Sequence, residues 1–199
     1  MSNIDIVSPM RFSDIVFVWH LRDERQIAWH GRSHSHGEAL QEIHYFISGG
    51  GSFLNGRKRV AIEAGSLHLT PPGVIHQIIA TDAKKPITYY AILFDAEGDG
   101  ELGDLLARFG PEAGPWNIGT ARRFFFADLL ERHFSGRDEL ARSATHQFMS
   151  FLYDLAAGTS PARDAADNAN VEKALAIMQD AIDRDLDLGE LASRVSLSR

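Results

Sequence analysis

The hydrophobic pattern of this chain changes period near residue 95. Before that point, short runs rich in β-branched and aromatic residues are separated by Gly and Pro clusters such as Gly49-Gly50-Gly51 and Pro71-Pro72-Gly73. Runs of this kind with turn residues between them predict the strands of a β-sandwich or barrel. The expected strands cover residues 15–21, 26–30, 42–48, 52–54, 57–62, 66–70, 77–80 and 88–94.

Alternation along residues 42–48 assigns each side chain to one of two faces of a strand. Glu42, His44, Phe46 and Ser48 share one face, and Ile43, Tyr45 and Ile47 share the other. The pair Asn55-Gly56 lies between the next two runs. Because Asn-Gly is a strong signal for a two-residue type I′ turn, we expect a hairpin over 52–62 that turns at this pair.

After residue 95, apolar positions recur at helical spacing. Leu102, Leu105, Leu106 and Phe109 predict a first helix, which the Pro-containing segment 110–119 ends. Residues 121–134 and 138–155 each carry an apolar stripe, and the short turn between them favours an antiparallel helix pair. The run Phe124-Phe125-Phe126 and the stripe of Phe148, Phe151 and Leu155 are either plain core or, in part, a dimer seam.

The end of the chain has a different composition. Residues 158–170 are small, polar and Pro-containing, so we interpret them as a linker. Beyond the linker, 171–182 and 188–195 have the pattern of two further helices. The sequence therefore predicts four parts: a mainly β unit over 1–97, a helical segment over 98–157, the linker over 158–170, and a second helical unit over 171–199.

Composition limits the classes of function. An apolar content of 44% supports a packed core, and a net charge of −7 with a pI near 5.7 argues against a surface that grips nucleic acid as a whole. The absence of cysteine excludes disulfides and thiol catalysis and is compatible with the cytoplasm, the expected location. We read no signal peptide and no run of about 18 apolar residues, so no membrane segment is expected.

Four residues have the types and spacing of a metal site: His34, His36, Glu42 and His76. His34 and His36 are two positions apart, so both side chains would leave the same face of an extended segment. Three imidazole nitrogens and one carboxylate oxygen, with coordination positions left over, suit a divalent transition metal such as Zn, Ni, Fe or Mn. The alternative is that the same side chains hydrogen-bond a ligand without any metal.

The stretch from His34 to His76 resembles the two motifs of the cupin superfamily. His34-Ser35-His36, Glu42 and Gly49 match the first motif, with five residues between His36 and Glu42. Gly65, Pro71-Pro72-Gly73 and His76 match the second motif, which ends here in Ala80 where asparagine is usual. The resemblance covers about residues 15–94 and implies a double-sheet jelly roll. It also implies that His34, His36, Glu42 and His76 are the metal ligands and point into the barrel.

Four more residues are candidates for contact with a small molecule. His44 shares a face with Glu42 and is either a ligand contact or a satisfied interior histidine. His30, His68 and Trp19 could also line the pocket. A pocket with several histidines suits an anionic or hydroxylated molecule, and we expect a sugar or a small acid.

The end of the chain carries a second resemblance. Leu188, Leu191-Ala192, Val195 and Leu197-Ser198-Arg199 are similar to the opening of the AraC-type DNA-binding domain. The order of a cupin unit, a helical dimerisation segment and this opening is the order of AraC-type regulators. The sequence stops where the recognition helix would begin, so we interpret the chain as a fragment of a longer regulator. Promoter DNA is accordingly expected as a partner only of the full-length protein.

Two classes of function follow. The first is a non-enzymatic sensor: a homodimer in which binding of a small molecule, and of a metal where present, changes how the helices pair between two subunits. The second is a metal-dependent cupin enzyme, a dioxygenase or an isomerase, because the expected site keeps open coordination positions. The order of the domains favours the sensor.

Overall fold

The structure is a computed structural model that describes residues 10–21, 24–80, 84–96, 100–110, 113–157, 174, 177–178 and 187–194. The strands are β1 (Arg11–Leu21), β2 (Leu40–Ser48), β3 (Gly51–Asn55), β4 (Lys58–Ala61), β5 (Ser66–Thr70), β6 (His76–Ala80), β7 (Ile87–Asp95) and β8 (Trp116–Asn117). The helices are α1 (Glu24–His30), α2 (Gly100–Ala107), the 3-10 turn η1 (Thr120–Arg122), α3 (Arg123–His133), α4 (Asp138–Ala156) and α6 (Leu188–Arg194).

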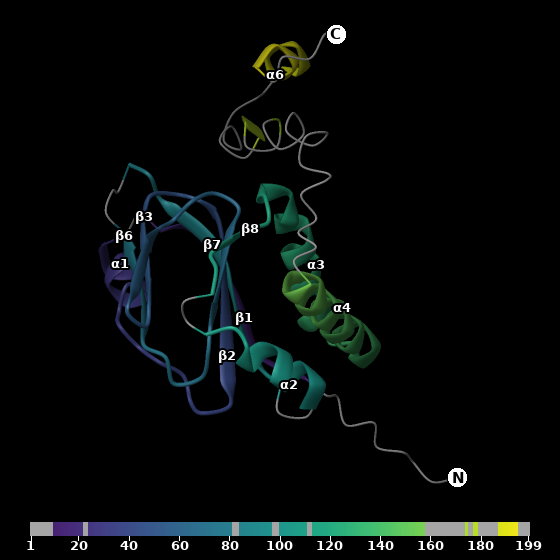
Figure 1. The fold of residues 1–199 in the computed structure, drawn as a ribbon. Helices are drawn as coiled ribbons and strands as arrows, with labels where there is room; N and C mark the ends of the chain where they lie inside the picture. The colour runs from purple at the N-terminus through teal and green to yellow at the C-terminus, as the bar shows by residue number, and fades with distance from the viewer. Residues whose placement is uncertain are drawn as a thin grey trace.

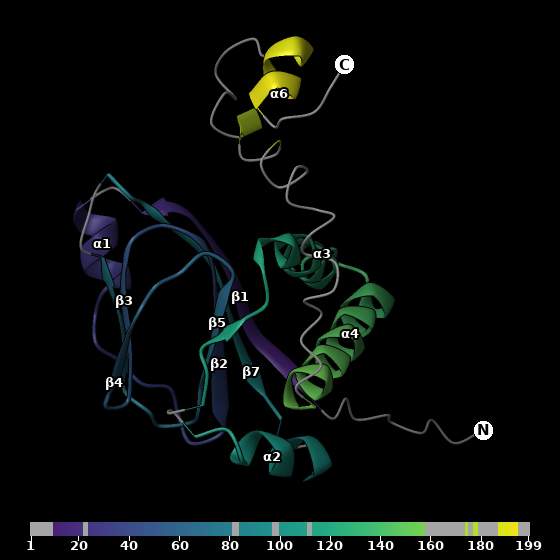
Figure 2. The same ribbon diagram turned by 45° about the horizontal axis from the view of Figure 1, so that its top comes forward.

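The strands form two sheets that face each other. One sheet has five strands in the order β1-β7-β2-β5-β8, and the other has three in the order β4-β3-β6. Helices α2, α3 and α4 cover the face of the five-stranded sheet that is turned away from the three-stranded sheet (Figures 1 and 2). A mainly β unit followed by helices is therefore confirmed, while the finer assignment to a closed jelly roll stays a prediction.

Alternation along β2 explains the three layers. Ile43 and Tyr45 point to the helices, where the Tyr45 ring stacks on Phe126 of α3 with 4.5 Å between centroids. Phe46 points the other way and contacts Phe53 of the three-stranded sheet at 5.8 Å. The expected assignment of these side chains to two faces is confirmed, and each face buries its own apolar cluster.

The helical layer is tied to the sheet by aromatic side chains. Phe148 of α4 is fully buried and lies 5.3 Å from the Phe12 ring of β1 and 5.2 Å from the Phe94 ring of β7, between centroids. Phe151 and Leu155 are also buried. The apolar stripe of α4 is thus core within this chain, which decides one alternative that the sequence left open.

The expected strand over 26–30 is wrong, because these residues belong to α1. In a strand, Ile27 and Trp29 would lie on one face. In the helix they separate: Ile27 packs against the interior cluster between the sheets, whereas Trp29 is exposed. A short segment with one apolar residue to bury can satisfy its backbone within a helix and needs no strand partner.

The expected hairpin is confirmed, but its turn lies one residue later than predicted. Asn55 pairs with Lys58, so the two turn residues are Gly56 and Arg57. Of these two, only Gly56 has a positive φ, 61°, which is the pattern of a type II′ turn rather than type I′. Asn55 stays in the strand, where its buried side-chain amide donates a hydrogen bond to the Leu69 carbonyl at 2.9 Å.

Strand β8 was not predicted from the sequence. Its residues Trp116 and Asn117 pair with Leu67 and Ser66 at the edge of the five-stranded sheet. The close approach depends on Gly65, whose φ is +84° and on which a Cβ atom would lie 2.9 Å from the backbone of Gly119. A two-residue strand that pairs only with a distant segment leaves no periodicity to detect in the sequence.

Of the second helical unit, the structure describes α6, Ala174 and the pair Ile177 and Met178. Leu191 of α6 and Ile177 form a small buried cluster of their own. The expected linker over 158–170 and most of the expected helix over 171–182 lie outside the described residues. Within the part of the chain that is described, no helix is long and apolar enough to cross a membrane.

Candidate metal centre

The two motif segments are held together by backbone hydrogen bonds. His34 lies in the irregular segment before β2 and pairs with His76, the first residue of β6. The His34 amide donates to the His76 carbonyl at 3.1 Å, and the His76 amide donates to the His34 carbonyl at 2.8 Å. The Gly73 amide donates to the His36 carbonyl at 3.2 Å, so the turn after Pro72 also reaches the first motif.

Glu42 of β2 is the centre of the cluster. Its Oε2 atom lies 2.9 Å from Nε2 of His36 and 2.7 Å from Nε2 of His76. One ligand atom from each of His34, His36, Glu42 and His76 can be chosen so that all four lie within 4.8 Å of one another. Glu42 and His76 are buried, and the other two histidines are partly exposed.

Backbone carbonyls orient two of the imidazoles. Nδ1–H of His34 donates to the Arg32 carbonyl at 3.0 Å, and Nδ1–H of His76 donates to the Val74 carbonyl at 3.2 Å. A neutral imidazole that donates through Nδ1 presents a lone pair at Nε2. This arrangement, in which one ring nitrogen is fixed by the backbone and the other is left for a metal, is common in metal sites.

The distances suit a first-row metal. Two ligand atoms that bind at about 2.1 Å and at right angles are about 3.0 Å apart, and two opposite ones about 4.2 Å apart. The contacts of Glu42 with His36 and His76 are close to the first value, and the outer limit of 4.8 Å is near the second. The buried cluster of three histidines and one glutamate could therefore hold a metal ion after small side-chain movements.

The electrostatics of the cluster centre on the carboxylate. Burial by itself raises the pKa of Glu42, but the neighbouring imidazoles of His44, His36 and His76 hold this pKa well below its usual range. Glu42 is therefore ionised at neutral pH. Burial lowers the pKa of His34, which favours the neutral form that a metal needs.

His44 and His68 lie deeper between the sheets. They are direct partners across β2 and β5, and each is 3% exposed. Burial lowers the pKa of His44 to about 3 against the opposing effect of Glu42, and burial together with Lys58 lowers the pKa of His68 to about 4. Nε2 of His44 is 3.6 Å from Oε1 of Glu42, so His44 adjoins the cluster.

The other two candidates lie elsewhere. His30 of α1 accepts a 2.8 Å hydrogen bond at Nδ1 from the Tyr89 hydroxyl, and the Tyr89 ring is 5.8 Å from the His44 ring between centroids. His30 is thus linked to the cluster through Tyr89. Trp19 is 44% exposed and lines a cavity away from the cluster, between the five-stranded sheet and α3. The structure does not bring Trp19 together with the histidines.

Sequence reasoning missed three polar neighbours of the site. Thr70 is the direct partner of Glu42 on β5, Asn55 pairs with His76, and Tyr89 contacts His44. The sequence did contain a signal for Thr70. Ser66, His68 and Thr70 alternate with leucines, which places the three polar side chains on one face of the strand. Burial raises the pKa of Tyr89, so its hydroxyl stays protonated at neutral pH.

Two facing sheets with a histidine–glutamate cluster between them and helices on the outer face define a small ligand-binding β domain. The sequence model of the AraC-like ligand binding domain matches residues 21–156, which is more than half of the chain. The chain therefore belongs to this family. Among curated proteins, none matches the chain.

Solved structures include several partial matches. A cupin protein from Bacteroides fragilis is 25% identical, with a TM-score of 0.34, over 41% of this chain and 64% of that one. The plu4264 protein from Photorhabdus luminescens is 20% identical, with a TM-score of 0.29, over 37% and 57%. An apo ToxT variant from Vibrio cholerae is 8% identical, with a TM-score of 0.39, over 97% and 72%. The chain spans less than two thirds of the first two structures.

Proposed function

We propose that this chain is the effector-sensing domain of an AraC-type transcriptional regulator and that His34, His36, Glu42 and His76 bind a divalent transition metal. The convergence of four ligand atoms within 4.8 Å carries the metal part of the proposal. Membership in the family of AraC-like ligand-binding domains supports the regulator part. When bound, the metal supplies a Lewis acid that can hold an oxygen atom of the effector.

Buried polar atoms support a small molecule beside the metal. Nδ1 of His44, Nε2 of His68 and Oγ1 of Thr70 have no hydrogen-bond partner among the described residues. Buried polar groups nearly always have partners in folded proteins, and water or a polar ligand is the remaining source. Such atoms near the cluster suit a molecule with several oxygens, such as a sugar or a small hydroxy acid.

The metal is tested on the protein purified without chelator. Elemental analysis should find close to one equivalent of a first-row metal, and chelation should lower the melting temperature reversibly. His76→Ala should abolish both effects, whereas His146→Ala should abolish neither, because His146 is exposed on α4. The metal proposal would be wrong if the purified protein held no metal and if added Zn, Ni, Fe and Mn left its melting temperature unchanged. The four residues would then serve only as hydrogen-bonding groups.

The effector is tested with a panel of glucose, galactose, citrate and malate. A binder should raise the melting temperature of the metal-loaded protein and lose this effect in Thr70→Val, which keeps the side-chain volume but removes the hydroxyl.

The alternative function, a metal-dependent cupin enzyme, is supported by the three-histidine, one-glutamate donor set with open positions. A sensor returns the bound molecule unchanged, so conversion of a panel member, followed by NMR, would favour the enzyme.

Homodimer formation is part of the sensor proposal. Two aromatic side chains remain exposed in the single chain: Phe124 of α3 at 52%, and Phe134, which directly follows α3, at 63%. Exposed aromatic residues on a helix that also packs on the ligand-binding sheet are a route by which binding could affect subunit pairing. Light scattering should give a dimer at micromolar concentration, and a monomer would remove the dimer from the proposal.

A further inference from the structure

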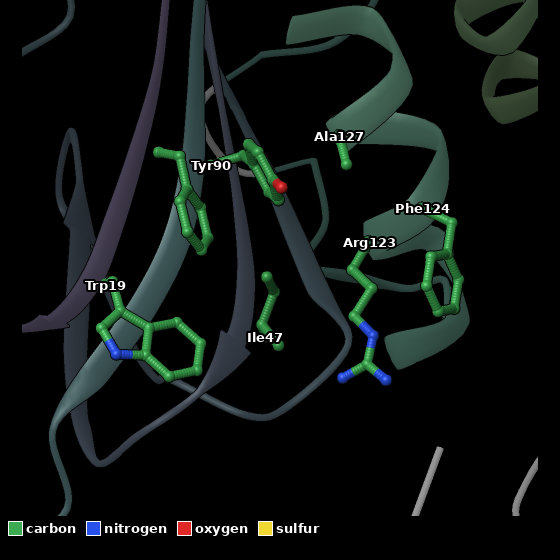
Figure 3. A pocket seen from close by; sticks show the side chains of 7 residues that line it. Trp19, Ile47, Tyr90, Arg123, Phe124 and Ala127 are labelled. Carbon is green, nitrogen blue, oxygen red and sulfur yellow. The ribbon is translucent and has the colours of Figure 1, made fainter. Parts of the chain in front are cut away.

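A cavity lies on the opposite face of the five-stranded sheet from the histidine cluster. It has a volume of about 120 Å³ and lies between the sheet and the start of α3. Its lining consists of Phe17, Trp19, Ile47, Tyr90, Arg123, Phe124 and Ala127. Figure 3 shows Trp19 and Phe124 on opposite sides of this space, with Ile47 and Tyr90 on its sheet side.

The strand pairing explains why aromatic residues gather there. Phe17 of β1 is the direct partner of Tyr90 of β7, and their rings are 4.7 Å apart between centroids. Trp19 is two residues further along β1, so it follows Phe17 on the same face. A bulge between Val18 and Leu21 then ends this alternation. The amide of His20 in the bulge donates to Oγ1 of Thr88 at 3.1 Å, which fixes the backbone beside Trp19.

Arg123 gives this aromatic cavity a positive charge. It is the first residue of α3, it is 8% exposed, and it is the one charged residue in the lining. A guanidinium stays protonated at all ordinary pH values, so Arg123 contributes a positive charge to the lining of this partly open cavity. Its field reaches Tyr90 across the cavity: burial raises the pKa of the Tyr90 hydroxyl, and Arg123 opposes part of that rise.

We propose that this cavity is a second ligand site, which takes a monocyclic aromatic carboxylate. A cavity of about 150 Å³ is known to hold a benzene ring, and the partly open space here is comparable. The ring would lie among Phe17, Trp19 and Phe124, where offset or edge contacts between aromatic groups are favourable. The carboxylate would face the fork of Arg123, which matches two carboxylate oxygens.

This site does not depend on the metal. Its lining residues come from β1, β2, β7 and α3, and none of them belongs to the histidine cluster. Because α3 supplies both the cation and one aromatic wall, an occupant would be held between the sheet and the helical layer. The position of α3 on the sheet is therefore the structural feature that such a ligand would stabilise.

Sodium benzoate is the first probe, and the three tryptophan indole N–H signals in a nitrogen–proton NMR spectrum report where it binds. The Trp19 signal, assigned with Trp19→Phe, should shift in a saturable way. The signals of Trp29, which is exposed on α1, and of Trp116, which lies on β8, should stay in place and serve as internal controls. Benzamide has the same shape without the charge and should bind at least about tenfold more weakly.

A matched pair of variants tests the cation. Arg123→Gln should weaken benzoate binding at least about tenfold by calorimetry, since a charge-assisted contact is lost. Arg122→Gln removes the same charge one residue away, outside the lining, and should bind like the parent. Circular dichroism confirms that each variant is folded, and the benzoate–benzamide comparison on the parent protein needs no variant at all. Benzoate binding should also survive chelation and His76→Ala, which separates this site from the metal centre.

Three outcomes would overturn the proposal. The first is a Trp19 signal that does not move at benzoate concentrations up to about 10 mM, near the limit of useful affinity. The second is binding that is equal for benzoate and benzamide or equal in Arg123→Gln. The third is a Trp19 signal that depends on protein concentration rather than on benzoate, which would assign this aromatic surface to a second copy of the chain.

Discussion

The two faces of the five-stranded sheet differ in chemistry although they are made by the same strands. The adjacent tyrosines of β7 show this most directly. Tyr89 points between the sheets, where its hydroxyl donates to His30 and its ring adjoins His44. Tyr90 points to the helices and lines the cavity with Arg123. Because successive side chains of a strand leave opposite faces, one short segment can serve two unrelated sites.

The two regions also differ in the sign of the charge they present. The interior region has an ionised glutamate surrounded by histidines and attracts a cation. The helix-facing region has a buried arginine among aromatic side chains, and we propose that it takes an anion. The interior cluster is fixed by backbone pairing within the β unit, whereas the helix-facing cavity exists only because α3 rests on the sheet. A change in the helical layer should therefore alter the helix-facing cavity more than the interior cluster.

The largest effect on stability is expected where the helices meet the sheet. Phe148→Ala should lower the free energy of unfolding by about 3–5 kcal/mol, because it removes a fully buried ring and leaves a cavity between α4 and the sheet. Denaturant titration measures this change. Phe134→Ala removes the same ring from an exposed position and should cost no more than about 0.5 kcal/mol. Equal losses in the two variants would contradict the layered core.

The next effect concerns the interior region alone. Glu42→Ala should weaken metal binding at least about a hundredfold, because it removes the carboxylate on which two histidines converge. Competition with a chromogenic chelator measures the affinity. Glu38→Ala removes an exposed carboxylate from the same segment and should leave the affinity unchanged. If Glu42→Ala also weakened benzoate binding, the two regions would not be independent.

A smaller effect compares two glycines with positive φ, Gly65 directly before β5 and Gly73 in the turn before β6. Gly65→Ala should lower the free energy of unfolding by about 1–3 kcal/mol, since its φ is +84° and the new Cβ would meet the Gly119 backbone at 2.9 Å. Gly73, in the turn before His76, has a φ of +69° but open space around it. Gly73→Ala should therefore cost only the backbone strain, about 1 kcal/mol. A larger loss for Gly73→Ala, measured by thermal unfolding, would contradict this order.

The smallest effect is expected at an ion pair outside both regions. Nε of Arg132 lies 2.6 Å from Asp128, one turn earlier on α3, and both side chains are partly exposed. Arg132→Ala should change the free energy of unfolding by no more than about 0.5 kcal/mol. A double-mutant cycle with Asp128→Ala measures the pair directly. A coupling well above this value would show that charge, rather than apolar packing, holds α3 in the helical layer.

The sequence by itself determined the local features of this protein. Alternation placed Glu42, His44 and Phe46 on one face of a strand, and the residue types and spacing of His34, His36, Glu42 and His76 predicted a candidate cluster. These predictions succeed because strand faces and turn residues depend on near neighbours in the chain. Two predictions were wrong: residues 26–30 form a helix rather than a strand, and the turn after β3 lies one residue later. Both outcomes depend on distant residues, because Ile27 packs between the sheets and Asn55 donates a hydrogen bond to Leu69.

Only the tertiary structure decided how distant segments meet. Strand β8 pairs with β5, and the cavity around Arg123 brings β1 and α3 together, so both features join residues far apart in sequence. The tertiary structure also places Trp19 away from the histidines. Trp19 and Arg123 carry no common motif, and nothing in the local pattern shows that α3 begins over β1 and β7. Such contacts are fixed by the packing of whole layers, and the free energy of that packing depends on every side chain in the interface rather than on any short stretch.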